Sequence, residues 1–394
     1  MNIGILGVLK YYNFFISSMN HLIGTDFNVV HLFVPLGLSF YIFQFIGLLY
    51  DSYKGRITTI SILDYSVFVT YFPKIIQGPI TRYQDFIDEL NKNRQYNADL
   101  FVRGIYLMTI GFGKKILIAD ALGKFVNVGF STNYLTYNSL MSIILILSYT
   151  FQIYFDFSGY TDLSRGISYL FNIELPCNFN SPYKALSIND FWKRWHMSLT
   201  SFFTRYLYIP LGGNRNGELR TYINTMIVFL VSGLWHGANM TFIVWGFIHG
   251  LISCLEKKFK CLEHLNKGLR WIYTFMLINF TWLIFRSESL NQVLVILRNI
   301  LSFDFSVSDF TLFSPLYLEE ITYVLSVLKM SKLDKIMPFV ILLICLGLCL
   351  CFKNSDEIVE NFEPNLMKCF FVIIILSWSL LHFGQKVIFI YEMF

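Results

Sequence analysis

The chain has 394 residues, of which 55% are hydrophobic and only 14% carry a charged side chain, well below the roughly 25% of an ordinary soluble domain. The formal net charge of +5 is small for this length, and the basic residues lack the clustering and interleaved aromatic residues of a nucleic-acid-binding patch. This composition argues against a soluble globular protein and against nucleic acid as a partner, so a membrane is the expected solvent.

Apolar stretches near the length that crosses a bilayer recur along the chain. They cover residues 29–50, 101–118, 140–157, 221–255, 271–285, 337–352 and 369–391. We therefore predict an all-α, polytopic membrane bundle of about eight to ten transmembrane helices, with re-entrant or interfacial helices between them. We treat residues 1–394 as one domain, with a motif-bearing core over about 5–290 and C-terminal transmembrane helices over about 337–392.

An apolar helix is expected to end at residues 154–162, where two carboxylates flank a Ser-Gly turn. Because buried charges need partners, we predict that Asp156 and Asp162 form ion pairs with Arg194 or Arg205. Paired carboxylates also serve glycosidases, but that chemistry requires an open carbohydrate cleft. The pattern therefore favours a structural role.

The segment 188–215 fits neither a lipid-facing helix nor an ordinary soluble one. Asn189 or Asp190 is expected to cap a helix start, and Pro210 with the following glycines is expected to end it. The opposite face is polar, which suits an interfacial or re-entrant helix at a water-filled opening, and an amphipathic surface helix fits equally well. The apolar stripe at helical spacing consists of Trp192, Trp195, Leu199 and Phe202.

The stretch 221–255 is too long for one simple crossing, and its glycines and histidines favour a broken or tilted element. It places His236 between Trp235 and Gly237, deep within apolar sequence. Ionisable groups there are functional by default, and a buried neutral imidazole is suited to accept a proton from a hydroxyl. Gly237 is expected to let a substrate approach closely. The alternative is a packing histidine bonded to a neighbouring helix.

His249 does not share a helix face with His236, so a metal site on one helix is not supported. The cysteines lie mostly in apolar sequence without paired metal spacing and are interpreted as small hydrophobic residues. Basic residues between 256 and 270 follow a long apolar segment, which favours a cytoplasmic loop.

Several short motifs occur together in a fixed order. They are 34–44 (VPLGLSFYIFQ), 77–82 (QGPITR), 156–162 (DFSGYTD), Asn178-Phe179 with Pro182-Tyr183, 192–215, and 234–238 (LWHGA). In this order they resemble the bacterial membrane-bound O-acyltransferases, in the branch of alginate O-acetyltransferases and teichoic-acid D-alanyl transferases. Members of that family usually carry further hydrophobic sequence ahead of the stretch that begins at Leu9 here.

The resemblance implies a helical bundle around a funnel or tunnel, with His236 as the catalytic residue and His196 as a supporting histidine. It implies an acyl thioester donor, acetyl-CoA or an acyl carrier protein, and a polysaccharide acceptor whose hydroxyl loses its proton to the histidine. The predicted substrate-binding residues are Asp190, Arg194, Trp195, Arg205, Tyr208, Trp235 and Asn239.

The main hypothesis is acyl transfer, acetyl first of all, to an exported polysaccharide by a multi-pass protein of the cytoplasmic membrane. Contact with membrane lipid and an extracytoplasmic, esterase-like partner are expected, and no metal or resident cofactor is expected. D-alanyl transfer to teichoic acid from a carrier protein is the alternative enzyme. A transporter or flippase would use the histidines as a proton relay, but no second, symmetry-related copy of the Trp-His-Gly segment is present. A non-catalytic membrane scaffold has no chemical need for both histidines.

Overall fold

The computed structural model describes residues 2–30, 35, 37–92, 95–306, 310–316, 319–329 and 331–382. All regular elements of this part are helical, and its only extended pairing is an isolated antiparallel bridge between Phe179 and Trp195. The all-α prediction is confirmed. The α-helices are α1 (Asn2–Ile23), α2 (Leu38–Tyr53), α3 (Ile62–Thr70), α4 (Tyr83–Leu90), α5 (Ala98–Phe112), α6 (Asp120–Ser131), α7 (Ser139–Leu170), α8 (Ile188–Trp192), α9 (Met197–Phe203), α10 (Gly217–His236), α11 (Met240–Phe259), α12 (Lys267–Arg286), α13 (Leu290–Leu301), α14 (Glu319–Val327), α15 (Met337–Cys351), α16 (Ser355–Glu360) and α17 (Leu366–His382).

Three of the described helices are long and apolar enough to cross a membrane. They span Ser139–Leu170, Lys267–Arg286 and Asp334–Cys351. The helices Leu290–Leu301 and Leu366–His382 are apolar but shorter. Residues 31–34 and 36 of the first predicted span, and 383–392 at the C-terminal end, lie outside the described residues. The larger number of crossings and the central funnel stay predictions.

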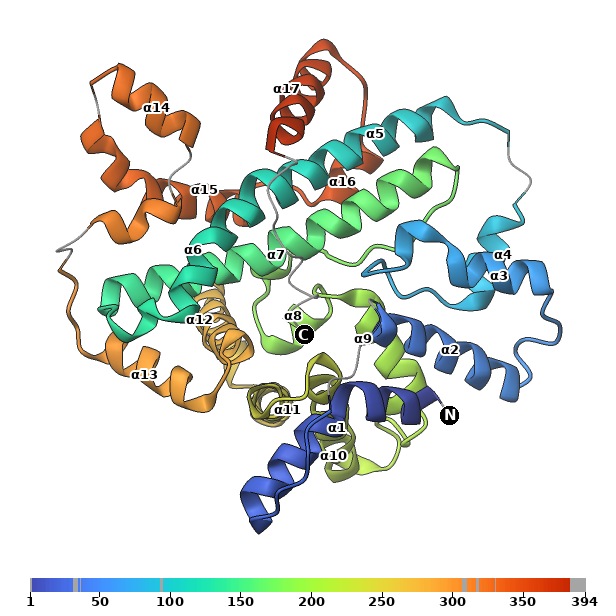
Figure 1. Cartoon of the computed structure of the whole chain (residues 1–394). Coiled ribbons are helices and arrows are strands. Elements are labelled where there is room, and N and C mark those ends of the chain that lie inside the picture. The colour runs from blue at the N-terminus through green and yellow to red at the C-terminus, as the bar shows by residue number, and fades with distance from the viewer. Residues whose placement is uncertain are drawn as a thin grey trace.

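Helices α5 and α7 pack closely side by side across the middle of the molecule (Figure 1). A Cβ atom added to Gly104 would lie 2.8 Å from the carbonyl oxygen of Gly166, and one added to Gly111 would lie 2.8 Å from that of Gly159. Within each helix the two glycines are about two helical turns apart. The two close contacts therefore lie along the same line between α5 and α7. Small residues let helix backbones approach in this way in membranes, where burial of apolar surface drives little association.

The carboxylates of α7 pair with two consecutive lysines, not with the arginines we predicted. The Nζ atom of Lys114 lies 2.7 Å from an Asp162 oxygen, and Lys115 pairs with Asp156 and, at 2.8 Å, with Asp120. Both lysines sit on a π-helical turn, Gly113–Ala119, that joins α5 to α6. Residues 154–162 are also not a turn, because α7 continues through them to Leu170. The predicted ion-pair role is confirmed, whereas its partners and the turn were wrong.

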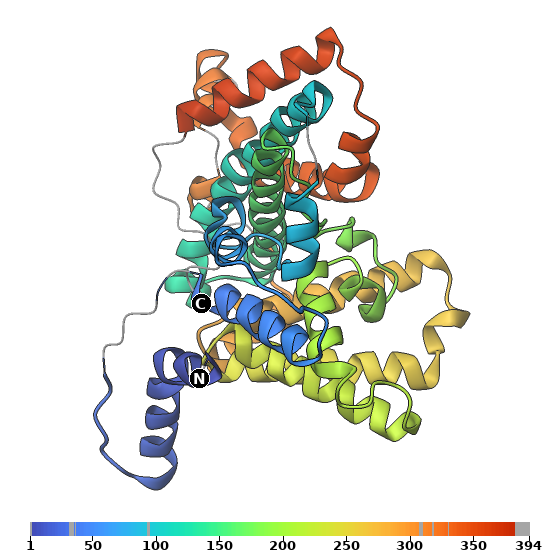
Figure 2. The same ribbon diagram turned by 90° about the vertical axis from the view of Figure 1, so that its right-hand side faces the viewer.

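The long apolar stretch 221–255 is two helices, α10 and α11, as the broken-element prediction required. They are separated by Gly237, which has an extended backbone, and by Asn239, the N-cap of α11. Added Cβ atoms at Gly233 and Gly246 would lie 2.3 and 2.4 Å from carbonyl oxygens of the opposite helix. This hairpin lies below the layer of α5 and α7, and α17 lies above it (Figures 1 and 2).

The segment 188–208 is not one helix, contrary to the periodicity of its apolar residues. Helix α8 ends at Trp192, α9 begins at Met197, and His196 between them has a left-handed backbone with φ 46° and ψ 53°. The cap of α8 is Ser187, whose Oγ accepts from the Asp190 N–H at 3.0 Å, not Asn189 or Asp190. The stripe residues Trp192, Trp195, Leu199 and Phe202 are all buried. These four residues therefore do not form one face of a single helix, and packing from several directions buries them.

Candidate active site

His236 is the last residue of α10, and only 5% of its surface is exposed. Its ring centroid lies 4.8 Å from that of Trp235, 5.3 Å from Trp245 and 5.1 Å from Phe285. Burial among aromatic rings disfavours a charged imidazole. The position of His236 at a helix end inside the bundle therefore suits a neutral proton acceptor.

Gly237 is explained by packing in this structure. A Cβ atom at this position would lie 2.2 Å from a ring carbon of Phe242. The Phe242 ring thus occupies the space that we expected to be left for a substrate. The centroid of the Phe242 ring lies 4.9 Å from that of Phe285, a neighbour of His236. Gly237 therefore lets Phe242 pack with the aromatic residues around the histidine.

His196 is 1% exposed, and its left-handed backbone turns the chain from α8 into α9. Its Nδ1 lies 3.2 Å from Oδ1 of Asn178, and the Phe157 ring lies 4.7 Å from its ring in an edge contact. The Trp235 ring is 6.4 Å from the His196 ring and 4.8 Å from the His236 ring. The structure therefore brings both predicted catalytic histidines to one tryptophan.

Asn178 is a site residue that the sequence analysis recognised only as part of a motif. It is fully buried, and its Oδ1 accepts from the N–H of Ser198 at 3.1 Å and from its Oγ at 3.0 Å. Backbone bonds from Met197 N to Asn178 O, 3.0 Å, and from Asn180 N to Arg194 O, 2.9 Å, hold the two segments together. Asn178 thus fixes the side of His196 that faces it.

A third histidine, His249, belongs to the same aromatic cluster. Its Nδ1 accepts from Nε1 of Trp192 at 3.2 Å, which leaves Nε2 as the protonated nitrogen of a neutral ring. The Trp245 ring lies 4.8 Å from His249 and 5.3 Å from His236. The sequence does not predict this contact, because nothing in the local pattern around His249 reveals Trp245 or Trp192 as a neighbour.

Asp190, Arg194 and Asn239, three of the predicted substrate-binding residues, make close polar contacts with other residues of the chain. Asp190 and Arg194 form an ion pair of 2.8 Å, and both side chains are about one third exposed. The Asn239 Nδ2 donates to the Glu288 carbonyl at 2.8 Å, and its Oδ1 accepts from the Thr241 N–H at the start of α11. These contacts are structural, and the roles of the three residues toward a substrate stay predictions.

The other four predicted substrate-binding residues differ in exposure. Trp235 and Trp195 are 4% and 2% exposed, so each is part of the aromatic core. Arg205 and Tyr208 are half-buried on the π-helical turn Thr204–Tyr208 that follows α9. Arg205 lies 3.6 Å from Asp51 of α2.

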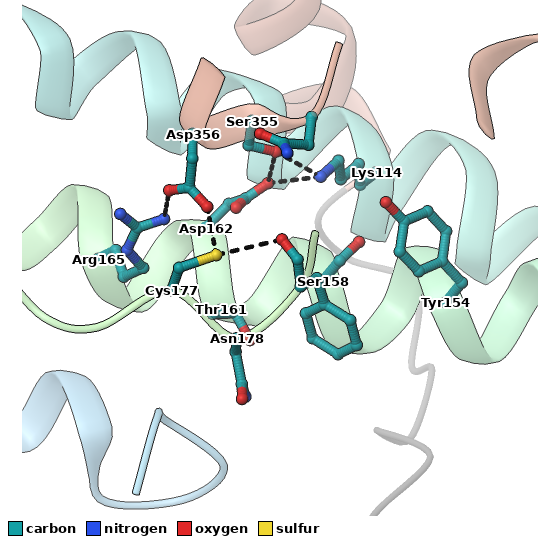
Figure 3. A pocket seen from close by; sticks show the side chains of 12 residues that line it. Lys114, Tyr154, Ser158, Thr161, Asp162, Arg165, Cys177, Asn178, Ser355 and Asp356 are labelled. Carbon is teal, nitrogen blue, oxygen red and sulfur yellow. Dashed lines mark hydrogen bonds and ion pairs between the residues drawn. The ribbon is translucent and has the colours of Figure 1, made fainter. Parts of the chain in front are cut away.

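Two small polar pockets reach the residues that hold His196, and neither has His236 in its lining. The first, the α7 pocket, is drawn in Figure 3. It is lined by Lys114, Tyr154, Ser158, Thr161, Asp162, Arg165, Cys177, Asn178, Phe179, Asn354, Ser355 and Asp356. The second, the α2 pocket, is lined by Phe43, Gln44, Gly47, Ile80, Thr81, Arg82, Ser198, Ser201, Phe202, Arg205 and Tyr206. Asn178 of the first pocket and Ser198 of the second are hydrogen-bonded to each other.

The thiol in the α7 pocket is poorly suited to act as a nucleophile. The Sγ of Cys177 lies 3.1 Å from the Phe179 carbonyl oxygen and also contacts the carboxylate of Asp356 (Figure 3), and its one proton can be donated to either. Burial, with that carboxylate beside it, raises the pKa of Cys177 to about 12. Because thiolates and not thiols attack acyl groups, this environment disfavours an acyl-cysteine intermediate at Cys177 at neutral pH.

The chain belongs to the membrane-bound O-acyltransferase family, whose sequence model matches residues 8–288. This range contains both histidines, Asn178 and the α10–α11 hairpin. Membership in a family of acyltransferases identifies the chain as an enzyme of that class and disfavours the transporter reading.

Relatives of the chain include proteins named as acetyl and D-alanyl transferases. The chain is 34% identical to the peptidoglycan O-acetyltransferase of Helicobacter pylori over 95% of this chain and 77% of that protein. It is 38% identical to the probable alginate O-acetylase of Azotobacter vinelandii over 77% of this chain and 62% of that protein. Identity to the teichoic acid D-alanyltransferase of Bacillus subtilis is 30%, over 60% of this chain and 62% of that protein.

Proposed function

We propose that the chain transfers an acyl group, most directly acetyl, from a thioester donor to hydroxyl groups of a cell-surface polysaccharide, with His236 as general base. The observation that supports this most strongly is the convergence of His236 and His196 on Trp235 inside the family-defining segment. Two relatives that align with most of this chain act, by name, on peptidoglycan and alginate.

The proposed step is a direct acyl transfer. The imidazole of His236 takes the proton of the acceptor hydroxyl, and the hydroxyl oxygen attacks the thioester carbonyl carbon. The C–S bond then breaks, and the thiol leaves with the proton that the imidazole returns. His196, held by Asn178, orients the surroundings of the base, and Asp190, Arg194, Arg205, Tyr208 and Asn239 shape the approach of the substrates.

The membrane arrangement follows from charge. Lys257, Lys258 and Lys260 end α11 and are expected on the cytoplasmic side. We propose that an exported polymer and an extracytoplasmic partner meet the enzyme on the outer side of the cytoplasmic membrane, while acetyl-CoA or an acyl carrier protein approaches from the cytoplasm.

The test is a His236→Ala variant expressed in a strain that lacks the native gene. We expect the variant to reach the membrane in normal amount and to lose ester on surface glycan, measured by mass analysis of the isolated polymer. His264→Ala, which changes an exposed histidine, is the matched control. Undiminished acylation by His236→Ala contradicts the proposal. The mass of the ester that is lost distinguishes acetyl from D-alanyl, which the Bacillus subtilis relative keeps as the second candidate.

A further inference from the structure

Helix α1 contacts the end of α10 through two consecutive side chains. The Nζ of Lys10 donates to the carbonyl of Trp235 at 2.8 Å and to that of His236 at 3.1 Å. The Tyr11 hydroxyl donates to the Leu234 carbonyl. The bonded carbonyls belong to the last three residues of α10.

These carbonyls need partners from outside their helix. The last four carbonyl groups of an α-helix have no intrahelical donor, and the C-terminal end carries a partial negative charge that favours a cation. Glycines often cap such ends in a left-handed conformation, but Gly237 has φ −173°. The cap is therefore supplied by α1.

The cap acts on the residue that carries the proposed chemistry. A hydrogen bond to the His236 carbonyl restricts the backbone at the point where α10 ends, and the ring moves with that backbone. Lys10 does not touch the reacting atoms in this arrangement. Its long side chain crosses from α1 with the ammonium as the only polar end, so the contact combines charge with position.

We propose that Lys10 is a positioning residue for acyl transfer, because its ammonium holds the C-terminal carbonyls of α10 and thereby fixes His236. The inference rests on the proposed function of His236. The proposal gives a role to Lys10 and Tyr11, which begin the polar Lys-Tyr-Tyr-Asn stretch within the apolar N-terminal segment. A shift of about 1 Å at a catalytic group costs on the order of a hundredfold in rate, so loss of this hold is expected to slow transfer strongly.

The test compares two substitutions of the same lysine. Lys10→Met keeps the length of the side chain and removes the charge and its donors, whereas Lys10→Arg keeps both. Lys257→Met makes the same chemical change at an exposed lysine near the other end of α11, away from His236. Each full-length variant is expressed in the deletion strain, its amount in the membrane is measured, and the rate of ester formation on surface glycan is followed by alkaline release.

We expect Lys10→Met to be present in normal amount and to form ester about ten- to a hundredfold more slowly, about 1.4 to 2.7 kcal/mol of barrier. Lys10→Arg is expected to restore most of the rate, and Lys257→Met to match the wild type. A wild-type rate in Lys10→Met overturns the proposal, as does equal loss in Lys10→Met and Lys10→Arg. Loss of both proteins from the membrane assigns Lys10 to folding and also overturns it. Activity in His236→Ala instead overturns the proposed function itself.

Discussion

The Asn178→Leu substitution tests how the structure holds His196. The Asn178 Oδ1 accepts from the N–H and the Oγ of Ser198, at 3.1 and 3.0 Å, and lies 3.2 Å from Nδ1 of His196. Asn178 is fully buried, so no bulk water replaces a lost acceptor. Leucine fills similar space and removes the oxygen that all three groups share.

The expected loss of stability follows from those three groups. A buried donor left without a partner costs about 1–3 kcal/mol, so three of them together cost at least about 3 kcal/mol. A typical destabilising point mutation costs about 1 kcal/mol, so this change is well above average. His196 also loses the contact that fixes its ring, and ester formation is expected to fall together with stability.

The measurement is thermal unfolding of the detergent-solubilised protein, followed by tryptophan fluorescence. The control is Asn180→Leu, two residues away, where the side chain is exposed and accepts one bond from Asn354 at 2.9 Å. That change is expected to alter stability by no more than about 0.5 kcal/mol. If Asn178→Leu unfolds at the same temperature as the wild type and Asn180→Leu, the reasoning about the shared acceptor is refuted.

Three further changes test other parts of the structure. Gly246→Ala places a Cβ 2.4 Å from the Phe229 carbonyl, which forces α10 and α11 apart, and thermal unfolding should show a loss of about 1–3 kcal/mol. Asp356→Asn leaves the Arg165 guanidinium, 9% exposed, without its carboxylate, and the same assay should show a loss of about 3 kcal/mol. Cys177→Ser should leave ester formation unchanged, and iodoacetamide at pH 7 should not label Cys177, because its pKa of about 12 keeps the thiol protonated; inactivation of Cys177→Ser or rapid labelling contradicts this.

The sequence predicted the elements whose cause is local. The glycines and histidines between 221 and 255 indicated a break, and the chain does leave the helix at Gly237. The apolar composition indicated helices throughout, and every regular element of the described residues is helical. The ordered motifs indicated the family, and with it the two histidines that the structure brings to Trp235.

Local patterns failed where a distant segment decides the structure. The Ser-Gly pair after Asp156 looked like a turn, but Gly159 is a point where α7 meets the backbone of Gly111. Glycine there serves close packing and leaves the helix intact. Lys114 and Lys115, on a π-helical turn, form the ion pairs with the α7 carboxylates that we predicted for arginines. Because these lysines are far from the carboxylates in the sequence, a local pattern does not identify them as partners.

The region after residue 300 shows the same effect more strongly, because none of the ordered motifs lies in it. Asp356 at the start of α16 pairs with Arg165 of α7, and Ser355 donates to Asp162 at 2.7 Å (Figure 3). Ser355 and Asp356 line the α7 pocket together with Asn178. The polar residues of α16 are therefore tied to the supports of His196, although no motif in that segment indicated a site.

The supports of the two histidines come from opposite parts of the chain. His236 is held by α1 through Lys10, and His196 is held by Asn178, which in turn borders a pocket that α16 also lines. Both supports are residues other than the two histidines, so each can be weakened by a substitution that leaves His196 and His236 unchanged in sequence. Partial loss of activity after substitution of Lys10 or Asn178, with His236 and His196 unchanged, is therefore the behaviour that separates a site held by long-range contacts from one defined by its motifs alone.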